Sequence, residues 1–192
     1  MTLILNSILW VVFFISHSYL AAIPVKESLI SKLKWSEQRY RFAYSFLSSL
    51  LVAAIYLIQL FYPKLLFLKL ENWAVYLGVF LLLIGLIFNL LAFKNISARE
   101  FIGLQVRKTK ADKLIQKGIY TLVRHPIYTG LISLMMGLVL IQPNSYNALN
   151  FLLILVYLPI GIYFEEQKLI QLYGQDYLVY KKKVKAIIPF LI

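Results

Sequence analysis

Five apolar segments constrain the fold of this chain more than any other feature. They comprise residues 3–22, 42–62, 73–93, 126–142 and 148–164. The first three have the roughly 20 residues that a helix needs to cross a bilayer, and the last two, with about 17, lie at the lower limit. In lipid the backbone must satisfy its own hydrogen bonds, which a helix does within one segment. The pattern predicts an all-α, polytopic membrane helical bundle of about five transmembrane helices.

The composition excludes several other classes of protein. The chain is 61% hydrophobic and still carries a net charge of +12, a combination typical of an integral membrane protein. Because it has no cysteine and two histidines, we expect no disulfide framework, no cysteine nucleophile and no metal site. No Lys or Arg precedes the first segment, which is also too long for a signal-peptide core, so we expect a retained helix.

The distribution of charge orients the chain in the membrane. Of its 20 Lys and Arg residues, 18 lie in residues 23–41, in residues 94–124 or after Phe164. Because cytoplasmic loops accumulate Lys and Arg, this alternation predicts an outside N-terminus and a cytoplasmic C-terminus. The positive charge then reflects topology and contact with anionic lipid, and nucleic acid is not an expected partner.

We expect a single domain over residues 1–192. It divides into three N-terminal helices up to residue 93, a cytoplasmic loop at 94–125, and a helical hairpin with a C-terminal helix from residue 126. The stretch between the first two segments suits a short helix on the cytoplasmic surface. QPNSYN at residues 142–147 predicts a tight turn. Beyond Phe164 apolar residues recur every three or four positions, which predicts an amphipathic cytoplasmic extension with Gly174 as a candidate break.

The predicted hairpin brings two polar pairs to the same face of the membrane. VRHPIYTG, residues 123–130, begins one helix, and Glu165 and Glu166 end the next. Carboxylates at the end of a membrane helix need cationic or hydrogen-bonding partners. Two interpretations remain open. One is an interfacial salt bridge between Arg124 and Glu165, and the other is a functional cluster of Arg124, His125 and both glutamates.

The same residues carry a resemblance to a known family. GIYTLVRHPIYTG (118–130) and EEQKLIQLYGQDYLVYKKKVKAIIP (165–189) resemble the C-terminal half of integral membrane methyltransferases. This group includes isoprenylcysteine carboxyl methyltransferases, phospholipid methyltransferases and bacterial thiol S-methyltransferases. In the N-terminal half SHS, RYRFAY and FIGLQ are more similar to the thiol methyltransferases and to membrane proteins associated with nitrite and nitric oxide reductases.

The resemblance implies an S-adenosylmethionine-dependent methyltransferase whose active site faces the cytoplasm. Arg124 would position an anionic nucleophile or pair with Glu166, and His125 would accept a proton from a thiol. Arg124, His125 and Glu166 are therefore the expected catalytic residues. The resemblance places the cofactor against Gln105, Gly118, Tyr120, His125, Pro126, Tyr128, Gly130, Glu165, Glu166, Tyr173, Tyr177 and Tyr180.

The methyl acceptor is expected to be a lipophilic or small molecule that arrives from the bilayer. A thiol is favoured, followed by an isoprenylcysteine carboxylate and a phospholipid amine. His17, within the first segment, is either a substrate contact, together with Arg124, or a hydrogen-bonded packing residue. The alternative function is a non-catalytic membrane protein that supports a redox system or assembly. A transporter is disfavoured because the chain has no internal repeat.

Overall fold

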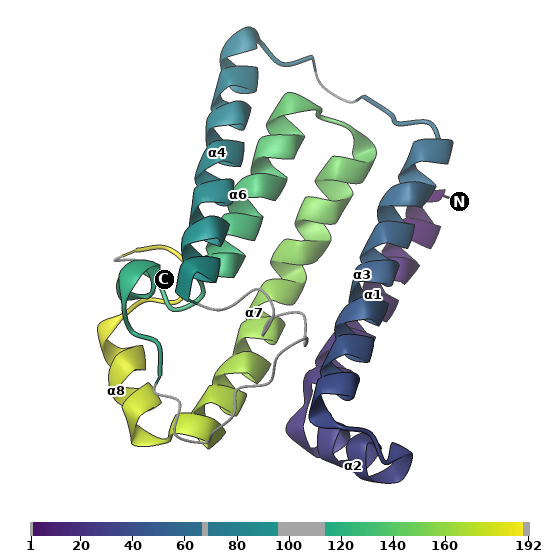
Figure 1. Ribbon diagram of the computed structural model, residues 1–192. Coiled ribbons are helices and arrows are strands. Elements are labelled where there is room, and N and C mark those ends of the chain that lie inside the picture. The colour runs from purple at the N-terminus through teal and green to yellow at the C-terminus, as the bar shows by residue number, and fades with distance from the viewer. Residues whose placement is uncertain (1, 67–68, 96–113, 190–192) are drawn as a thin grey trace.

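The structure is a computed structural model that describes residues 2–66, 69–95 and 114–189. This part of the chain folds into helices and confirms the prediction of an all-α membrane bundle (Figure 1). The helices are α1 (Thr2–Ala21), α2 (Ile23–Leu33), α3 (Glu37–Phe61), α4 (Asn72–Asn95), α6 (Pro126–Ile141), α7 (Ser145–Tyr173) and α8 (Gln175–Lys183), with a 3₁₀ turn at Gly118–Thr121.

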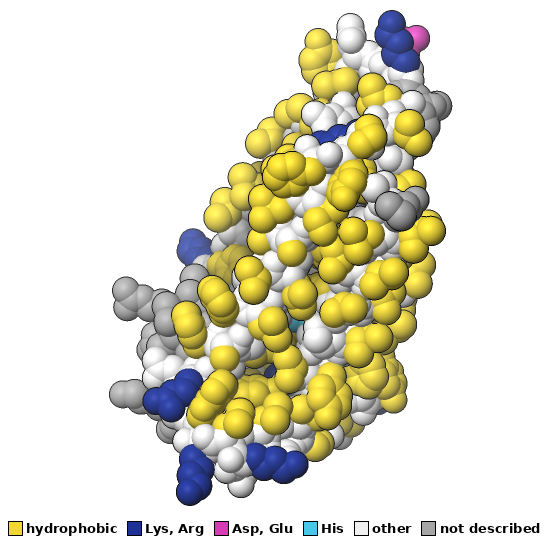
Figure 2. All heavy atoms as spheres, turned by 90° about the vertical axis from the view of Figure 1, so that its right-hand side faces the viewer, with side chains coloured by type: hydrophobic (Ala, Val, Ile, Leu, Met, Phe, Trp, Pro, Cys, Tyr) yellow, Lys and Arg dark blue, Asp and Glu magenta, His cyan; other side chains and the backbone are white. Residues whose placement is uncertain are grey.

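Among the described helices, α1, α3, α4 and α7 are long and apolar enough to cross a membrane. Helix α6 is apolar but has 16 residues, a length of about 24 Å against a hydrocarbon core of about 30 Å. It lies between α4 and α7 and continues their up-and-down order (Figure 1). Figure 2 shows hydrophobic side chains over most of the face formed by α1 and α3, with Lys and Arg gathered at its lower end.

Local signals in the sequence set the helix ends. The Ser36 side chain accepts a hydrogen bond from the backbone of Arg39 and caps α3, and Asn144 caps α7 in the same way. Pro126 begins α6, where its missing N–H leaves no bond unmade. Gly174, with a φ of 55°, ends α7 and confirms the predicted break. The predicted short helix between the first two spans is α2, which runs across the lower end of the bundle (Figure 1).

Glycines bring α4 and α6 into close contact. A Cβ atom on Gly130 would lie 2.5 Å from Nδ2 of Asn89 and 2.8 Å from the carbonyl oxygen of Gly85. Small residues of this kind allow membrane helices to approach closely. The family resemblance places Gly130 against the cofactor, but in the structure this position faces α4.

A buried polar network joins α1 and α3 to α7. The Asn150 side-chain oxygen accepts hydrogen bonds from Asn6 at 2.9 Å and from the Trp10 indole at 2.8 Å. The Asn6 oxygen accepts in turn from Gln59 at 2.8 Å. These side chains are buried within apolar helices, where a polar group without a partner is costly. The network therefore fixes α7 against the N-terminal helices, and the space between them forms the cavity described below.

Candidate active site

The hairpin of α6 and α7 brings the predicted polar pairs together. The Arg124 side chain donates to Oε1 of Glu166 from Nη2 at 2.7 Å and from Nε at 3.0 Å. This contact confirms the predicted meeting of the two helix ends. Arg124 pairs with Glu166, however, and not with Glu165 as the salt-bridge interpretation supposed.

Glu166 and Arg124 belong to a buried ion cluster. Lys181 of α8 places its Nζ atom 2.5 Å from Oε2 of Glu166. Arg124 also donates to the backbone carbonyls of Lys181 and Val184 at the end of α8. The Arg124 and Glu166 side chains are 8% and 7% exposed. Because all three guanidinium nitrogens of Arg124 donate within this cluster, Arg124 links the start of α6 to α7 and α8.

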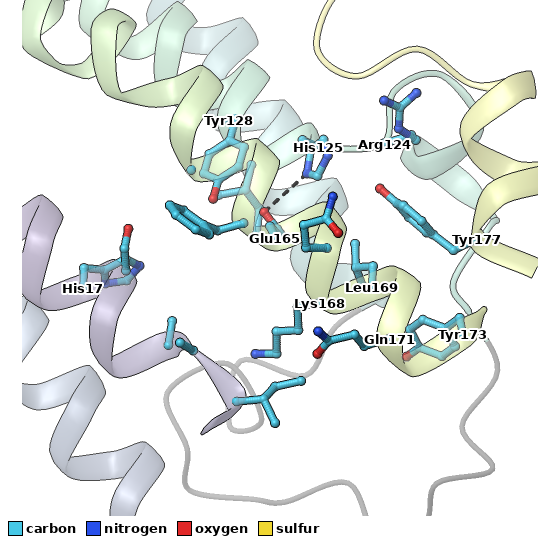
Figure 3. A pocket seen from close by; sticks show the side chains of 18 of the residues that line it. His17, Arg124, His125, Tyr128, Glu165, Lys168, Leu169, Gln171, Tyr173 and Tyr177 are labelled. Carbon is cyan, nitrogen blue, oxygen red and sulfur yellow. Dashed lines mark ion pairs between the residues drawn. The ribbon is translucent and has the colours of Figure 1, made fainter. Parts of the chain in front are cut away.

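Glu165 has a different environment from its neighbour. Consecutive residues of a helix point about 100° apart, and the Glu165 side chain is 44% exposed, toward the cavity. Its Oε2 atom lies 3.4 Å from Nδ1 of His125, the contact drawn in Figure 3. The Tyr128 ring stacks on His125 with centroids 5.6 Å apart, and its hydroxyl points to Glu165. The Glu165 carboxylate is therefore held in place by His125 and Tyr128 and remains accessible to a ligand in the cavity.

His125 lies between both carboxylates. Its Nδ1 is 3.4 Å from Glu165 and its Nε2 is 3.4 Å from Glu166, and the residue is 4% exposed. Burial lowers the pKa of His125, but hydrogen bonds to the two carboxylates and their charges outweigh burial, so its pKa lies above the usual 6.5. The two carboxylates thus favour the protonated imidazole, which donates hydrogen bonds, over the neutral form that the predicted role of His125 as a base requires.

A cavity of about 710 Å³ adjoins this cluster, within the range of roughly 300–1,000 Å³ usual for ligand sites. It lies between α7 and the N-terminal helices α1 and α3, and Glu165 is the one carboxylate among its described lining residues (Figure 3). Lys168 and Arg41 also line it, as do residues 114–115. The predicted site residues among its lining are His17, Tyr120, Arg124, His125, Pro126, Tyr128, Glu165, Tyr173, Tyr177 and Tyr180.

Tyrosines form the wall of the cavity near α8. The Tyr180 hydroxyl donates to the backbone carbonyl of Tyr120 at 2.6 Å. Burial raises the pKa of Tyr180 to about 12 against an opposing effect of Arg124, so this hydroxyl keeps its proton. Gly118, with a φ of 63°, begins the turn that carries Tyr120 and is not part of the described lining. Gln105 lies outside the described residues.

The C-terminal segment supports the site through contacts that the sequence patterns did not predict. The backbone N–H groups of Arg124 and His125 donate to the carbonyls of Lys185 at 2.8 Å and Ala186 at 2.9 Å. The Thr129 hydroxyl donates to the carbonyl of Ile187 at 2.7 Å. The only sequence signal for this segment is the family's closing I-P pair, Ile188 and Pro189. These bonds fix the backbone from which His125 faces the glutamates.

The lining fits S-adenosylmethionine, the cofactor that the resemblance implies. A carboxylate such as Glu165 can accept hydrogen bonds from a ribose diol or an ammonium group, and tyrosine faces attract a cation such as a sulfonium. Lys168 and Arg41 are suited to a carboxylate group of the ligand. The cavity thus combines a carboxylate, aromatic faces and cationic side chains, which are the three kinds of partner that the cofactor needs.

Comparison with known proteins supports the same family. The model of the phospholipid methyltransferase family matches residues 73–176. Protein-S-isoprenylcysteine O-methyltransferase B of Arabidopsis thaliana is 27% identical over 184 residues, which cover 94% of this chain and 90% of that protein. A probable protein-S-isoprenylcysteine O-methyltransferase of Oryza sativa subsp. indica is 32% identical over 124 residues, covering 63% and 64%. The Xenopus laevis enzyme is 28% identical over 131 residues, covering 68% and 44%. No solved structure matches.

These relatives correct one expectation about the acceptor. Their names describe O-methylation of isoprenylcysteine, so the preference for a thiol acceptor and the detailed likeness to bacterial thiol methyltransferases are not supported. The family and the fold together also set aside the non-catalytic alternative. The chain belongs to the phospholipid methyltransferase family and is an integral membrane methyltransferase that uses S-adenosylmethionine.

Proposed function

We propose that this protein methylates the carboxylate of a lipophilic acceptor and that this acceptor is an isoprenylated cysteine. The position of His125, 3.4 Å from each of two carboxylates, carries the proposal. Glu165 and Glu166 raise its pKa, which favours the protonated imidazole over the neutral base that a thiol acceptor would require. A thiol must lose a proton before it attacks, whereas a carboxylic acid with a pKa of about 4 is already ionised. The similarity to the Arabidopsis enzyme along nearly the whole chain points to the same class of acceptor.

Glu165, His125 and Tyr128 bind and orient the donor in this proposal. When bound, the cofactor supplies a methyl group that its sulfonium makes electrophilic. The bound cofactor would supply this methyl group to an acceptor oxygen, with S-adenosylhomocysteine as the other product, while Glu165, His125 and Tyr128 would hold it in place. The described residues align the two reactants and exclude water through the wall of tyrosines. Alignment of this kind can lower a barrier by on the order of 7–11 kcal/mol.

The cavity faces the cytoplasm in this proposal, and the acceptor reaches it from the bilayer. Lys and Arg concentrate at the end of the bundle that holds the cavity, as Figure 2 shows for one face. The cavity is lined by α1, α3 and α7, which are themselves long enough to span the bilayer. A prenyl chain can therefore remain among apolar helices while its polar end enters the site.

A labelled transfer assay tests this function. The detergent-purified protein is incubated with methyl-labelled S-adenosylmethionine and an N-acylated, S-farnesylated cysteine. The matched controls are the same compound with its carboxyl group amidated and a farnesyl thiol. We expect label in a base-labile methyl ester from the carboxylate alone. Transfer mainly to the thiol would overturn the acceptor class, and failure of the wild type to bind S-adenosylhomocysteine in calorimetry would overturn the cavity as the donor site.

A further inference from the structure

A second polar cluster lies on the α1 and α3 side of the cavity. It consists of His17 from α1 with Tyr44 and Ser48 from α3, all of which line the cavity. The Ser48 hydroxyl lies 3.2 Å from Nδ1 of His17, and the Tyr44 hydroxyl oxygen lies 2.9 Å from each ring nitrogen. Phe13 stacks on the His17 ring with centroids 5.2 Å apart. The imidazole is therefore held in place at the cavity wall, across from Glu165 (Figure 3).

Hydrogen-bonding groups are concentrated on this wall although the helices are membrane-spanning. The Ser18 hydroxyl lies 2.6 Å from that of Tyr157, and Ser45 and Ser49 line the cavity as well. On the same two helices Ile15 and Phe46 are largely exposed, as suits positions that face lipid. Polar side chains inside a membrane are expensive and commonly mark a substrate path. Packing alone would not require so many hydroxyls around one cavity.

The cluster also lies outside the residues that the family model matches. The family model matches residues 73–176, which include Glu165 and His125 but not α1 or α3. The family is named for the methylation of phospholipids, and the relatives are named for the methylation of isoprenylcysteine. A common methyl donor therefore serves different acceptors. Residues that recognise the acceptor are therefore expected on helices outside the family-model match, such as α1 and α3.

We propose that His17, Tyr44 and Ser48 form the subsite that binds the polar group next to the reacting carboxylate, an amide such as that of an N-acylated cysteine. This inference rests on the proposed function. An amide offers one donor and one acceptor and carries no charge, which matches an imidazole beside two hydroxyls. Tyr44 can bond either ring nitrogen of His17, and Ser48 can bond Nδ1. When both hydroxyls bond Nδ1, the acceptor amide takes the place of Tyr44 at Nε2. His17 contacts the acceptor, and Tyr44 and Ser48 are positioning residues.

Steady-state kinetics and direct binding with matched variants test the subsite. His17→Phe, Tyr44→Phe and Ser48→Ala are compared with Tyr56→Phe, whose hydroxyl on α3 contacts the sulfur of Met135 at 3.7 Å and lies outside the cavity lining. We expect His17→Phe to raise the acceptor KM roughly tenfold, the loss of about one hydrogen bond, and the two positioning variants to raise it less. The kcat and the S-adenosylhomocysteine Kd should change less than about twofold, as should every parameter of Tyr56→Phe.

A second acceptor separates recognition of the amide from general damage. A farnesyl thioether carboxylic acid without the acylamino group should have the same KM with the wild type and with His17→Phe. Calorimetric binding of the N-acylated acceptor to the S-adenosylhomocysteine-loaded protein supplies a readout without turnover.

The possible results distinguish the two proposals. An unchanged KM and Kd for the N-acylated acceptor in His17→Phe would overturn the subsite. If His17→Phe weakened the binding of S-adenosylhomocysteine as much as the binding of the acceptor, the role of His17 would be structural, which would also overturn the subsite. A wild type that binds the N-acylated acceptor but methylates no carboxylate would overturn the proposed function alone. Failure of the wild type to bind the N-acylated acceptor would overturn both.

Discussion

Adjacent glutamates on α7 are expected to have separable roles. Glu166 accepts two hydrogen bonds from Arg124 and contacts Lys181 at 2.5 Å. Glu166→Ala removes this carboxylate and leaves the Arg124 guanidinium, 8% exposed, without its counter-charge. Breaking one side of a buried ion pair costs about 3–5 kcal/mol. We expect the lower end, about 3 kcal/mol, because the carbonyls of Lys181 and Val184 still accept from Arg124.

Thermal unfolding in detergent measures this loss. For a chain of this length 1 kcal/mol corresponds to a Tm change of about 2–4 °C, so Glu166→Ala should lower the Tm by about 6–12 °C. Glu165→Gln is the matched variant. Its side chain is 44% exposed to the cavity, so we expect a Tm shift below about 2 °C but at least a roughly tenfold weaker binding of S-adenosylhomocysteine, the loss of one charge-assisted contact.

A double variant checks the physical reason. Arg124→Leu combined with Glu166→Leu removes both charges together, and replacing a buried pair by apolar residues is often nearly neutral. We expect its Tm to lie above that of Glu166→Ala. The reasoning is refuted if Glu165→Gln and Glu166→Ala lower the Tm equally, or if only Glu166→Ala weakens the binding of S-adenosylhomocysteine while leaving the Tm unchanged.

Two further predictions follow from the site and its support. Because the folded pKa of His125 is raised, its contribution to stability is complete below the unfolded pKa of about 6.5 and is lost as the pH rises through the folded pKa. The wild-type Tm should therefore fall with rising pH above about 6.5, relative to His125→Phe, and parallel profiles would contradict this. Gly130→Ala would place a Cβ 2.5 Å from Asn89 and 2.8 Å from the carbonyl of Gly85. We expect a loss of about 1–3 kcal/mol in unfolding free energy, measured by Tm, whereas an unchanged Tm would show that α4 and α6 are not packed this closely.

Hydropathy predicted the helices better than it predicted their ends. The second apolar segment was expected from Phe42, but α3 begins at Glu37 because Ser36 caps it and charged residues are tolerated at the interface. The last span was expected to end near Phe164, and the three- and four-residue spacing beyond it correctly predicted that the helix continues. Hydropathy detects the part of a helix that faces lipid, whereas caps and breaks determine where the helix ends.

Contacts between distant polar residues were beyond sequence reasoning. Asn6 and Asn150 are 144 positions apart, and their bond depends on how α1 packs against α7. The same holds for His17 with Tyr44 and for the backbone bonds from the C-terminal segment to His125. The available signal was an Asn, Gln or His within an apolar helix, which predicts that a partner exists but not which residue it is.

The separation of Glu165 from Glu166, by contrast, follows from helix geometry. Residues three or four apart share a helix face and adjacent residues do not. Tyr157, Gly161, Glu165 and Lys168 follow that spacing and line the cavity, which directs Glu166 to the neighbouring face, toward α8. The E-E pair of the family pattern thus serves two purposes. Glu166 with Arg124 joins three helices, and that junction holds His125 where it can support Glu165 at the cavity.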